Sequence, residues 1–409
     1  MRRYDIIVTI ILLISGVSRS SAQAIPPEEM LVIADSTLYA SQPVAADTVL
    51  VDSVAKPHRN LLQRVIDYFS ETEEEVIANA NKKFRVSILG GPNFSSDTGF
   101  GIGLAGVATY RLNGCDAPMQ PSSQTLFANY TTKGFWSVGV QGTTLFLGER
   151  MRMNSELVVN YSPRRFWGIG YERGEVNDGY TGLHQYDARV LLEMLFGIHG
   201  KFYVGPAVRW DYARSGETER IELFEGQDRV VRNYGFGVVA LYDSRDVMTN
   251  AYSGWYVYLG QLFRPKFLAN HYSFSTTDIK LCHYRSLWTG GVLAGEIRST
   301  FNFGNPSWAM MSLLGTPGTM RGYYKGRYRD KHITTVQVEL RQRVYKRSGL
   351  VVWGGGGSVY HDSESFKHWL PNYGIGYRFE FRNRVNVRLD YGFGKGGQNG
   401  FLFHINEAF

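Results

Sequence analysis

The feature that most constrains this fold is an alternation of apolar and polar residues that begins at Phe84 and continues almost to Phe409. A period of two is typical of a β-strand with one apolar and one polar face. Segment 384–394 alternates in this way, with Val385, Val387, Leu389 and Tyr391 on one face and Asn386, Arg388 and Asp390 on the other. Charges on one face only, strand after strand, favour a barrel with a polar lumen and an apolar exterior. A soluble β-sandwich, which would bury the apolar face instead, is the alternative.

The alternation predicts sixteen strands, an even number as in single-chain bacterial barrels. They are residues 84–90, 98–111, 124–132, 134–147, 150–161, 183–197, 201–213, 233–243, 253–264, 272–285, 289–303, 332–345, 349–361, 371–382, 384–394 and 399–409. Long connections at 162–182, 214–232 and 304–331 all fall on one side, as expected of outer loops. The connection 112–123 and the single-residue turn at Lys133 fit this scheme less well. The predicted fold class is all-β, a 16-stranded antiparallel transmembrane β-barrel over residues 84–409.

The residues before the barrel divide into three segments. Residues 1–24 resemble a secretory signal peptide, with two arginines, a short apolar run and a small-x-small cleavage site. Residues 25–59 are polar and contain prolines, which predicts a flexible periplasmic tether. Residues 60–83 have apolar residues at helical spacing and predict short amphipathic helices at the barrel mouth or membrane surface. A lumen plug or a partner-docking helix is the alternative for this last segment.

Composition supports a membrane barrel and excludes several other classes. The chain has 26 Tyr, 24 Phe and 46 Gly, which suits aromatic girdles at both membrane interfaces. A net charge of +7 on an exported protein indicates anionic lipid headgroups rather than nucleic acid as its partner. Hydrolase and metal motifs are missing, and Cys115 and Cys282 form no disulfide framework. We therefore expect no enzymatic activity, no metal and no cofactor.

The long connection 304–331 interrupts the alternation and is too long for a turn. It contains five glycines, five basic residues and three tyrosines, Tyr323, Tyr324 and Tyr328. Long loops in compact folds are usually functional or disordered, and this composition favours a packed, specific conformation. We interpret it as a loop that folds back into the barrel.

Motifs in and around this loop resemble those of a known family. Met320-Arg321-Gly322-Tyr323 resembles the Val-Arg-Gly-Phe/Tyr motif in the inward-folded loop of the BamA/TamA outer-membrane assembly superfamily, of the bacterial surface antigen type. Five predicted strands follow it, as in that family's sixteen-stranded barrel. Further resemblances are Asp243-Ser244-Arg245-Asp246, Tyr252-Ser253-Gly254-Trp255, Phe166-Trp167-Gly168-Ile169-Gly170 and the aromatic terminal strand FLFHINEAF. The resemblance covers residues 84–409 and implies a bacterial outer-membrane protein that assists insertion or translocation of other outer-membrane or surface proteins.

Two features depart from the family pattern. Residues 25–83 are too few for a periplasmic polypeptide-transport domain, so we expect the chain to lack these domains. The family's Phe-x-Asp-x-Gly motif, whose Asp receives the loop arginine, has Gly355 at the Asp position here. An unpaired charge in a partly desolvated lumen is costly, so Arg321 needs another acceptor. The candidates on predicted lumen faces are Glu339, Glu380 and Asp390; contact of Arg321 with lipid phosphate on an outer loop is the alternative.

The preferred hypothesis is a non-enzymatic barrel that acts through a weak seam between its first and last strands. The predicted first strand ends at Gly90-Gly91-Pro92, so few hydrogen bonds close it against 399–409, and unpaired backbone in lipid can exchange pairs with a client strand. The expected seam residues are Phe84, Val86, Ile88, Phe403, Ile405 and Phe409, with Val86 and Ile405 as a locking cysteine pair. Expected partners are outer-membrane lipid and client or accessory periplasmic proteins. The alternatives are a passive channel or structural barrel acting with a partner protein, and a membrane lipase or protease.

Overall fold

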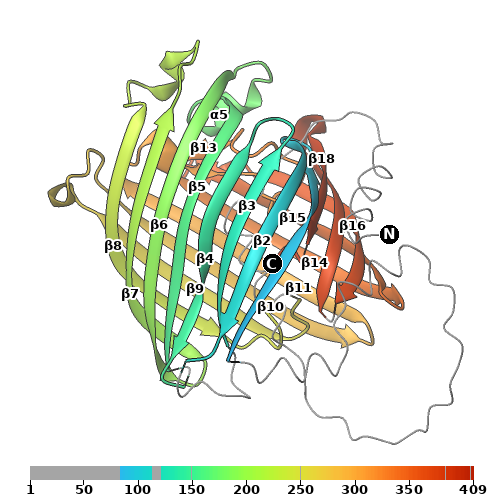
Figure 1. Ribbon diagram of the computed structural model, residues 1–409. Coiled ribbons are helices and arrows are strands. Elements are labelled where there is room, and N and C mark those ends of the chain that lie inside the picture. The colour runs from blue at the N-terminus through green and yellow to red at the C-terminus, as the bar shows by residue number, and fades with distance from the viewer. Residues whose placement is uncertain (1–82, 113–120, 149, 249, 383, 406) are drawn as a thin grey trace, which may run out of the picture.

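The computed structural model describes residues 83–112, 121–148, 150–248, 250–382, 384–405 and 407–409. In these ranges sixteen antiparallel strands form a closed barrel (Figure 1). The wall strands are β1 (Phe84–Ser95), β2 (Gly99–Tyr110), β3 (Ser122–Thr131), β4 (Trp136–Phe146), β5 (Met151–Phe166), β6 (Thr181–His199), β7 (Phe202–Ser215), β8 (Val230–Asp243), β9 (Gly254–Arg264), β10 (Phe274–Trp288), β11 (Gly291–Gly304), β14 (His332–Tyr345), β15 (Ser348–Tyr360), β16 (Leu370–Arg382), β17 (Val385–Gly394) and β18 (Asn399–Ile405). Neighbours in sequence pair in space, β11 pairs with β14, and β18 returns to β1. The predicted all-β barrel of sixteen antiparallel strands is confirmed.

The two faces of the wall strands differ as the alternation predicts. On β14, Val338 is 48% exposed whereas its neighbour Glu339 is 0% exposed. On β17, Tyr391 is 37% exposed whereas Asp390 is 0% exposed. An apolar outer surface around a polar interior is the pattern of a barrel surrounded by lipid.

Long connections gather at one end of the barrel and short turns at the other (Figure 1). The connections contain α5 (Tyr171–Glu175), η1 (Ile221–Phe224), η2 (Lys266–Leu268), η3 (Trp308–Met310), η4 (Ser365–Lys367) and η5 (Lys395–Gly397). Between β11 and β14, β12 (Ser312–Leu313) pairs with β13 (Arg329–Asp330) and holds the two ends of the intervening loop together. Among the described residues, no helix is long and apolar enough to cross a membrane.

The first strand is longer than predicted. It continues through Gly90-Gly91-Pro92 to Ser95, and all twelve residues pair with β2. The prediction that the strand ends at Gly90 is wrong because proline removes one donor without breaking a strand at a sheet edge, where that donor is not needed.

The last strand is shorter than predicted and ends at Ile405 rather than Phe409. Leu402 and His404 are buried while Phe403 lies on the other face, so a continued strand would point Glu407 at lipid. Glu407 instead turns inward, where Arg378 Nε and Asn386 Nδ2 donate to its carboxylate at 2.7 and 2.6 Å. A carboxylate facing lipid is costly, which explains why the strand stops here.

Other predicted boundaries shift or cannot be compared. The β3–β4 turn spans 132–135 rather than Lys133 alone, because Gly134 supplies the positive φ of 81° that the turn needs. The predicted signal peptide (1–24), tether (25–59) and amphipathic helices (60–83, except Lys83) lie outside the described residues, as does most of 112–123.

Candidate functional site

Arg321 lies in the β11–β14 connection and is fully buried, with 0% of its surface exposed. Its Nη1 donates to Asp390 Oδ2 on β17 at 2.8 Å, and its Nη2 donates to Glu339 Oε1 on β14 at 2.5 Å. Gln337 Oε1 accepts a further bond from Nη2 at 3.2 Å. A planar group with several donors suits two carboxylates at once, because each edge of the guanidinium serves one of them.

Glu380, the third predicted acceptor, lies elsewhere. Asp390 is opposite Gly376 in the β16–β17 ladder, so Glu380 is four residues, or about 13 Å, farther along β16. Its carboxylate accepts from the backbone N–H of Arg384 at 2.9 Å. The structure therefore brings Glu339 and Asp390 to Arg321 and leaves Glu380 at the turn end of the barrel.

Gly355 replaces the aspartate that the family motif would offer to Arg321, and the residue of β15 that contacts Arg321 here is Trp353. Trp353 lies opposite Glu339 in the β14–β15 ladder, and the Arg321 Cζ is 3.6 Å from the centre of the Trp353 ring. At Gly355 a Cβ would collide with the backbone carbonyl of Val336. Carboxylates on β14 and β17 thus supply the charge that the family motif places on this strand, and Trp353 covers the guanidinium face.

Glycine at position 322 follows from close contact between the loop and β17. Gly322 has φ 100°, and a Cβ there would lie 2.5 Å from the carbonyl oxygen of Gly392. The preceding Met320 also has positive φ, 56°. Asn372 Nδ2 on β16 donates to the Arg321 carbonyl. The loop backbone therefore lies directly on the wall, where a side chain at 322 has no room.

Tyr323 continues this contact to the hairpin between β17 and β18. Its side chain is 1% exposed, and its hydroxyl donates to the Pro371 carbonyl at 2.6 Å. The same hydroxyl accepts from the backbone N–H of Lys395 at 2.8 Å. Met320, 2% exposed, packs in a buried cluster with Tyr323, Tyr328, Leu370 and others. The motif thus joins β14, β16, β17 and the β17–β18 hairpin.

Arg321 belongs to a larger chain of alternating charges. Arg378 Nη1 donates to Asp390 Oδ1 at 2.5 Å and its Nε donates to Glu407. Arg341 Nε donates to Glu339 Oε2 at 2.9 Å. We call the six residues the lumen ion network: Arg321, Glu339, Arg341, Arg378, Asp390 and Glu407. Buried charges are tolerated only when paired in this way, so each member depends on its neighbours.

Sequence reasoning identified part of this network and missed the rest. The alternation placed Arg341 and Arg378 on the lumen face, and this was a usable signal for their role. Glu407 carried no such signal, because residues 399–409 read as one strand. Trp353 was visible as the aromatic position of the altered motif but was not proposed as a contact of Arg321.

The predicted seam residues do not all lie at the seam. Phe84, Val86 and Ile88 lie on the outer face of β1, 64%, 56% and 80% exposed, and pair with β2. Phe403 lies opposite Phe94, and Leu402 lies opposite Ser95; these two pairs make up the β1–β18 ladder in the described residues. Ile405 pairs with Val387 of β17.

Two details of the predicted seam are wrong. Because Phe94 lies opposite Phe403 in an antiparallel ladder, Ile405 is level with Pro92. Val86 is six residues farther along β1, so the two residues are roughly 20 Å out of register. Phe409 is not at the seam, because its ring centre is 6.2 Å from that of Tyr284 on β10. Its carbonyl accepts from Arg341 Nη2 at 3.1 Å. The terminal residues therefore lie against the inner wall.

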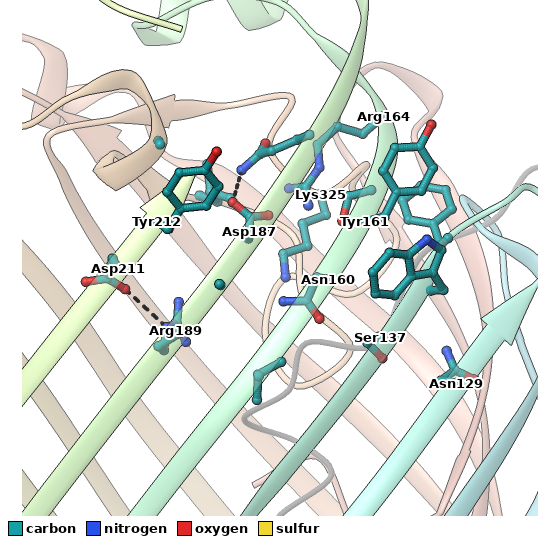
Figure 2. A pocket seen from close by; sticks show the side chains of 18 of the residues that line it. Asn129, Ser137, Asn160, Tyr161, Arg164, Asp187, Arg189, Asp211, Tyr212 and Lys325 are labelled. Carbon is teal, nitrogen blue, oxygen red and sulfur yellow. Dashed lines mark hydrogen bonds and ion pairs between the residues drawn. The ribbon is translucent and has the colours of Figure 1, made fainter. Parts of the chain in front are cut away.

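A second polar region of the lumen lies between β4–β7 and the long loop (Figure 2). It contains a cavity of about 160 Å³. Arg189 pairs with Asp211 at 3.4 Å, and Gln185 Nε2 donates to Asp187 Oδ1 at 2.6 Å (Figure 2). Lys325 enters from the loop side (Figure 2). The lumen is thus partly open here, whereas beside β14–β17 the buried Arg321 side chain contacts the wall strands.

The connection that contains α5 reaches across the outer end of the barrel. Glu175 accepts from Lys395 Nζ at 2.7 Å and from the Tyr328 hydroxyl at 2.9 Å. Tyr171 stacks on His368 with ring centres 4.5 Å apart. Burial disfavours ionisation of Glu175, but the bonds from Lys395 and Tyr328 outweigh it and lower its pKa. We call the Glu175–Lys395–Tyr328 contact the outer latch.

Within the described ranges, no group of three or more His, Cys, Asp or Glu side chains is arranged to hold a metal ion. The site is therefore a set of positioning contacts around Arg321, next to a short β1–β18 ladder.

Solved structures show where this architecture recurs. BamA from Haemophilus ducreyi lacking POTRA domains 1–3 superposes with a TM-score of 0.56 at 11% identity, covering 78% of this chain and 70% of that one. CdiB from Escherichia coli superposes with a TM-score of 0.50 at 9% identity, covering 80% of this chain and 63% of that one. No protein-family model and no curated protein sequence matches the chain. The chain therefore has the fold of the BamA-type sixteen-stranded barrels, as its sequence resemblance predicted, with the apolar exterior and polar interior of an outer-membrane barrel.

Proposed function

We propose that this barrel belongs to the outer-membrane assembly superfamily and assists insertion or translocation of outer-membrane or surface proteins through the β1–β18 seam. The observation that carries the proposal is the ladder of two residue pairs that join these strands among the described residues, beside twelve pairs between β1 and β2. Backbone groups left unpaired in lipid cost several kcal/mol each, so a strand from a client gains by pairing there.

The same proposal assigns a role to the long loop. We infer that residues 314–323 fold into the lumen and hold β14–β17 in place while the seam exchanges partners. Support comes from Arg321, whose carboxylate partners lie on the buried faces of β14 and β17. Glu407 supports it from the other side, because its bonds to Arg378 and Asn386 draw the residues after β18 away from β1.

The proposal is tested by locking the seam. In a background with Cys115 and Cys282 replaced, Phe94→Cys with Phe403→Cys places two thiols on directly opposed residues. Opposed residues of an antiparallel ladder have Cα atoms about 4.5–5.5 Å apart, within reach of a disulfide. The probe is an eight-stranded outer-membrane barrel, folding from urea into liposomes that contain the full chain and read by its gel shift. Oxidation is expected to abolish the stimulated folding, and reductant is expected to restore it.

A matched control separates seam opening from a general effect of cross-linking. Leu126→Cys with Val140→Cys bridges β3 and β4, which share eight residue pairs. This pair is expected to leave stimulation unchanged in both redox states. Full activity of the locked seam, or equal loss in the control, would count against seam exchange.

A passive channel or structural barrel is the competing function, and it makes a different prediction. The loop fills the lumen beside β14–β17 and the outer latch crosses the mouth, so we expect little conductance in planar bilayers. Large steady conductance without any stimulation of client folding would favour the channel. We propose no enzymatic role and no cofactor, and we propose client outer-membrane or secreted proteins as partners.

A further inference from the structure

The outward faces of β7 and β8 each carry an arginine near the end with the long loops: Arg214 is the last outward residue of β7, and only Val230 lies beyond Arg232 on β8. Arg214 and Arg232 are exposed, and they alternate with the buried Ala213, Val231 and Asn233. The outward positions toward the short-turn end are all apolar or aromatic: Phe202, Val204, Pro206, Val208, Trp210 and Tyr212 on β7, and Tyr234, Phe236, Val238, Ala240 and Tyr242 on β8. Two cations thus follow two uninterrupted lipid-facing rows.

The length of the apolar row fixes the depth of these arginines. Phe202 to Tyr212 is a rise of about 33 Å along the strand, or roughly 25 Å across the membrane at a tilt of about 40°. The apolar band of outer-membrane barrels has about this height. Arg214 is the next outward residue, so its guanidinium lies at the level of the outer headgroups.

A tyrosine lies opposite each of the two arginines in the strand ladders. Tyr186 on β6 lies opposite Arg214, and Tyr212 lies opposite Arg232. The Arg232 Cζ is 5.9 Å from the centre of the Tyr212 ring. We call Tyr186, Tyr212, Arg214 and Arg232 the basic rim. Tyrosine at a membrane interface keeps its ring in the apolar band and its hydroxyl toward the headgroups.

Neither arginine of the basic rim forms an ion pair with a carboxylate in the described part of the chain. The adjacent β7–β8 loop carries five acidic side chains, Glu217, Glu219, Glu222, Glu225 and Asp228. Glu222 pairs with Arg220 at 3.1 Å and Asp228 with His271 at 2.9 Å. The outward faces of β9, β11 and β17 end at this side in Phe263, Phe303 and Phe393, whereas β5 carries the exposed Arg165 there. The positive charge of Arg214 and Arg232 therefore lies on the strands themselves, beside an acidic loop.

We propose that the basic rim binds the phosphate of an outer-leaflet lipid headgroup. A guanidinium presents two parallel N–H groups that match phosphate oxygens, and two of them side by side suit a phosphorylated headgroup. The apolar rows of β7 and β8 directly below accept the acyl chains, which favours a lipid over free phosphate. This site is separate from the seam, on the far side of β1–β5, and does not depend on seam exchange.

The test measures binding of lipid A, with its two phosphates, to the full chain in uncharged detergent by native mass spectrometry. The comparison ligand is the same lipid after enzymatic removal of both phosphates. A cationic residue near an anionic surface contributes a factor of about five, so Arg214→Gln with Arg232→Gln is expected to weaken lipid A binding by about 25-fold. Binding of the dephosphorylated lipid is expected to stay unchanged. The double lysine variant keeps the charge and is expected to retain most of the affinity.

The control is Arg285→Gln, which removes an exposed, outward-facing arginine at the opposite end of β10. It is expected to change lipid A binding by less than a factor of two. Equal losses of affinity in the control and in the double variant would show that any exposed arginine contributes as much as the basic rim, and would overturn the proposal. Displacement of the lipid by inorganic phosphate at equal concentration would also overturn it, because the site would then be one for a free anion.

Discussion

The barrel is closed in two different ways at the β5–β6 junction and at the β1–β18 junction. Sixteen residue pairs, from Met151 with Phe196 to Phe166 with Thr181, join β5 to β6. In the part of the chain that the structure describes, two pairs join β1 to β18. Pro92 offers no N–H at this edge, and β18 ends at Ile405, so the difference follows from both strands.

The lumen differs in the opposite sense. Beside β4–β7 it holds a cavity of about 160 Å³, and the Arg189–Asp211 pair there is partly exposed on the arginine side. Beside β14–β17 the side chains of the lumen ion network are buried, and Arg321 is 0% exposed. Beside the long β5–β6 ladder the interior is loosely packed. Beside the short β1–β18 ladder, contacts between lumen side chains hold the neighbouring strands in place. This comparison implies that the two sides respond differently to removal of a lumen charge.

The largest expected effect is that of Arg321→Ala. It leaves Glu339 and Asp390 buried without this partner, and breaking a buried ion pair costs about 3–5 kcal/mol. The free energy of unfolding in urea, followed by loss of the compact form on gels, is expected to fall by that amount.

The control for this prediction lies on the long-ladder side. Arg189→Ala removes a side chain that is 29% exposed and that pairs with Asp211 and, at 3.5 Å, with Glu156. Asp211 keeps Arg209 and Arg264. A partly exposed pair contributes about 1 kcal/mol or less, so the expected loss is small. Equal losses in the two variants would show that the lumen ion network does not compensate for the short ladder.

Much of this comparison was predictable from sequence, because alternation fixes which face each side chain takes. It separated Val338 from Glu339 and Tyr391 from Asp390, and it put Arg341 and Arg378 in the lumen. The Met320-Arg321-Gly322-Tyr323 motif predicted the loop residue that needs a carboxylate. Gly355 signalled that the usual acceptor was missing, and alternation then restricted the replacement to a few lumen positions.

The contacts that were not predicted depend on the register between strands and on whether a residue continues its strand or turns inward, and alternation encodes neither. Glu380 has the correct face but the wrong height, because only the β16–β17 pairing shows that Asp390 lies opposite Gly376. Glu407 has strand-like spacing, yet it turns inward because Arg378 and Asn386 accommodate its carboxylate and lipid does not. Pro92 resembles a strand end, and only its position beside a nearly unpaired edge makes it tolerable.

A smaller effect is expected at the outer latch, where Lys395→Gln removes the cation that bonds Glu175 and Tyr171. The two charged side chains are 43% and 34% exposed, so the loss of stability is expected to be below about 1 kcal/mol. The α5 connection is expected to exchange its amide hydrogens faster, while β5 and β6 stay protected. The isosteric Glu175→Gln variant is expected to give the same pattern. Unchanged exchange in both variants would show that the outer latch does not stabilise the α5 connection.

Lowering the pH is expected to weaken the outer latch. The pKa of Glu175 is lowered from 4.5, so its contribution is present above that value and is lost as the pH falls through the lowered pKa. Faster exchange in α5, corrected for intrinsic rates, is therefore expected only below pH 4.5. An onset near neutral pH would point to another group.

The smallest effect is expected at the loop between β15 and β16, where His361 Nδ1 lies 3.0 Å from Asp330 of β13. The hydrogen bond to Asp330 raises the pKa of His361 above its ordinary value of 6.5. A raised pKa means that the pair stabilises the loop fully below pH 6.5 and loses this contribution as the pH rises through the raised value. Amide exchange of residues 361–368 is expected to quicken above that pH, and His361→Gln is expected to abolish the dependence. Asp330 lies in the two-stranded sheet that holds the ends of the long loop together. If the faster exchange extends to residues around Arg321, the outer loops and the lumen ion network move together. If it is confined to residues 361–368, the contacts inside the lumen hold β14–β17 independently of the outer loops.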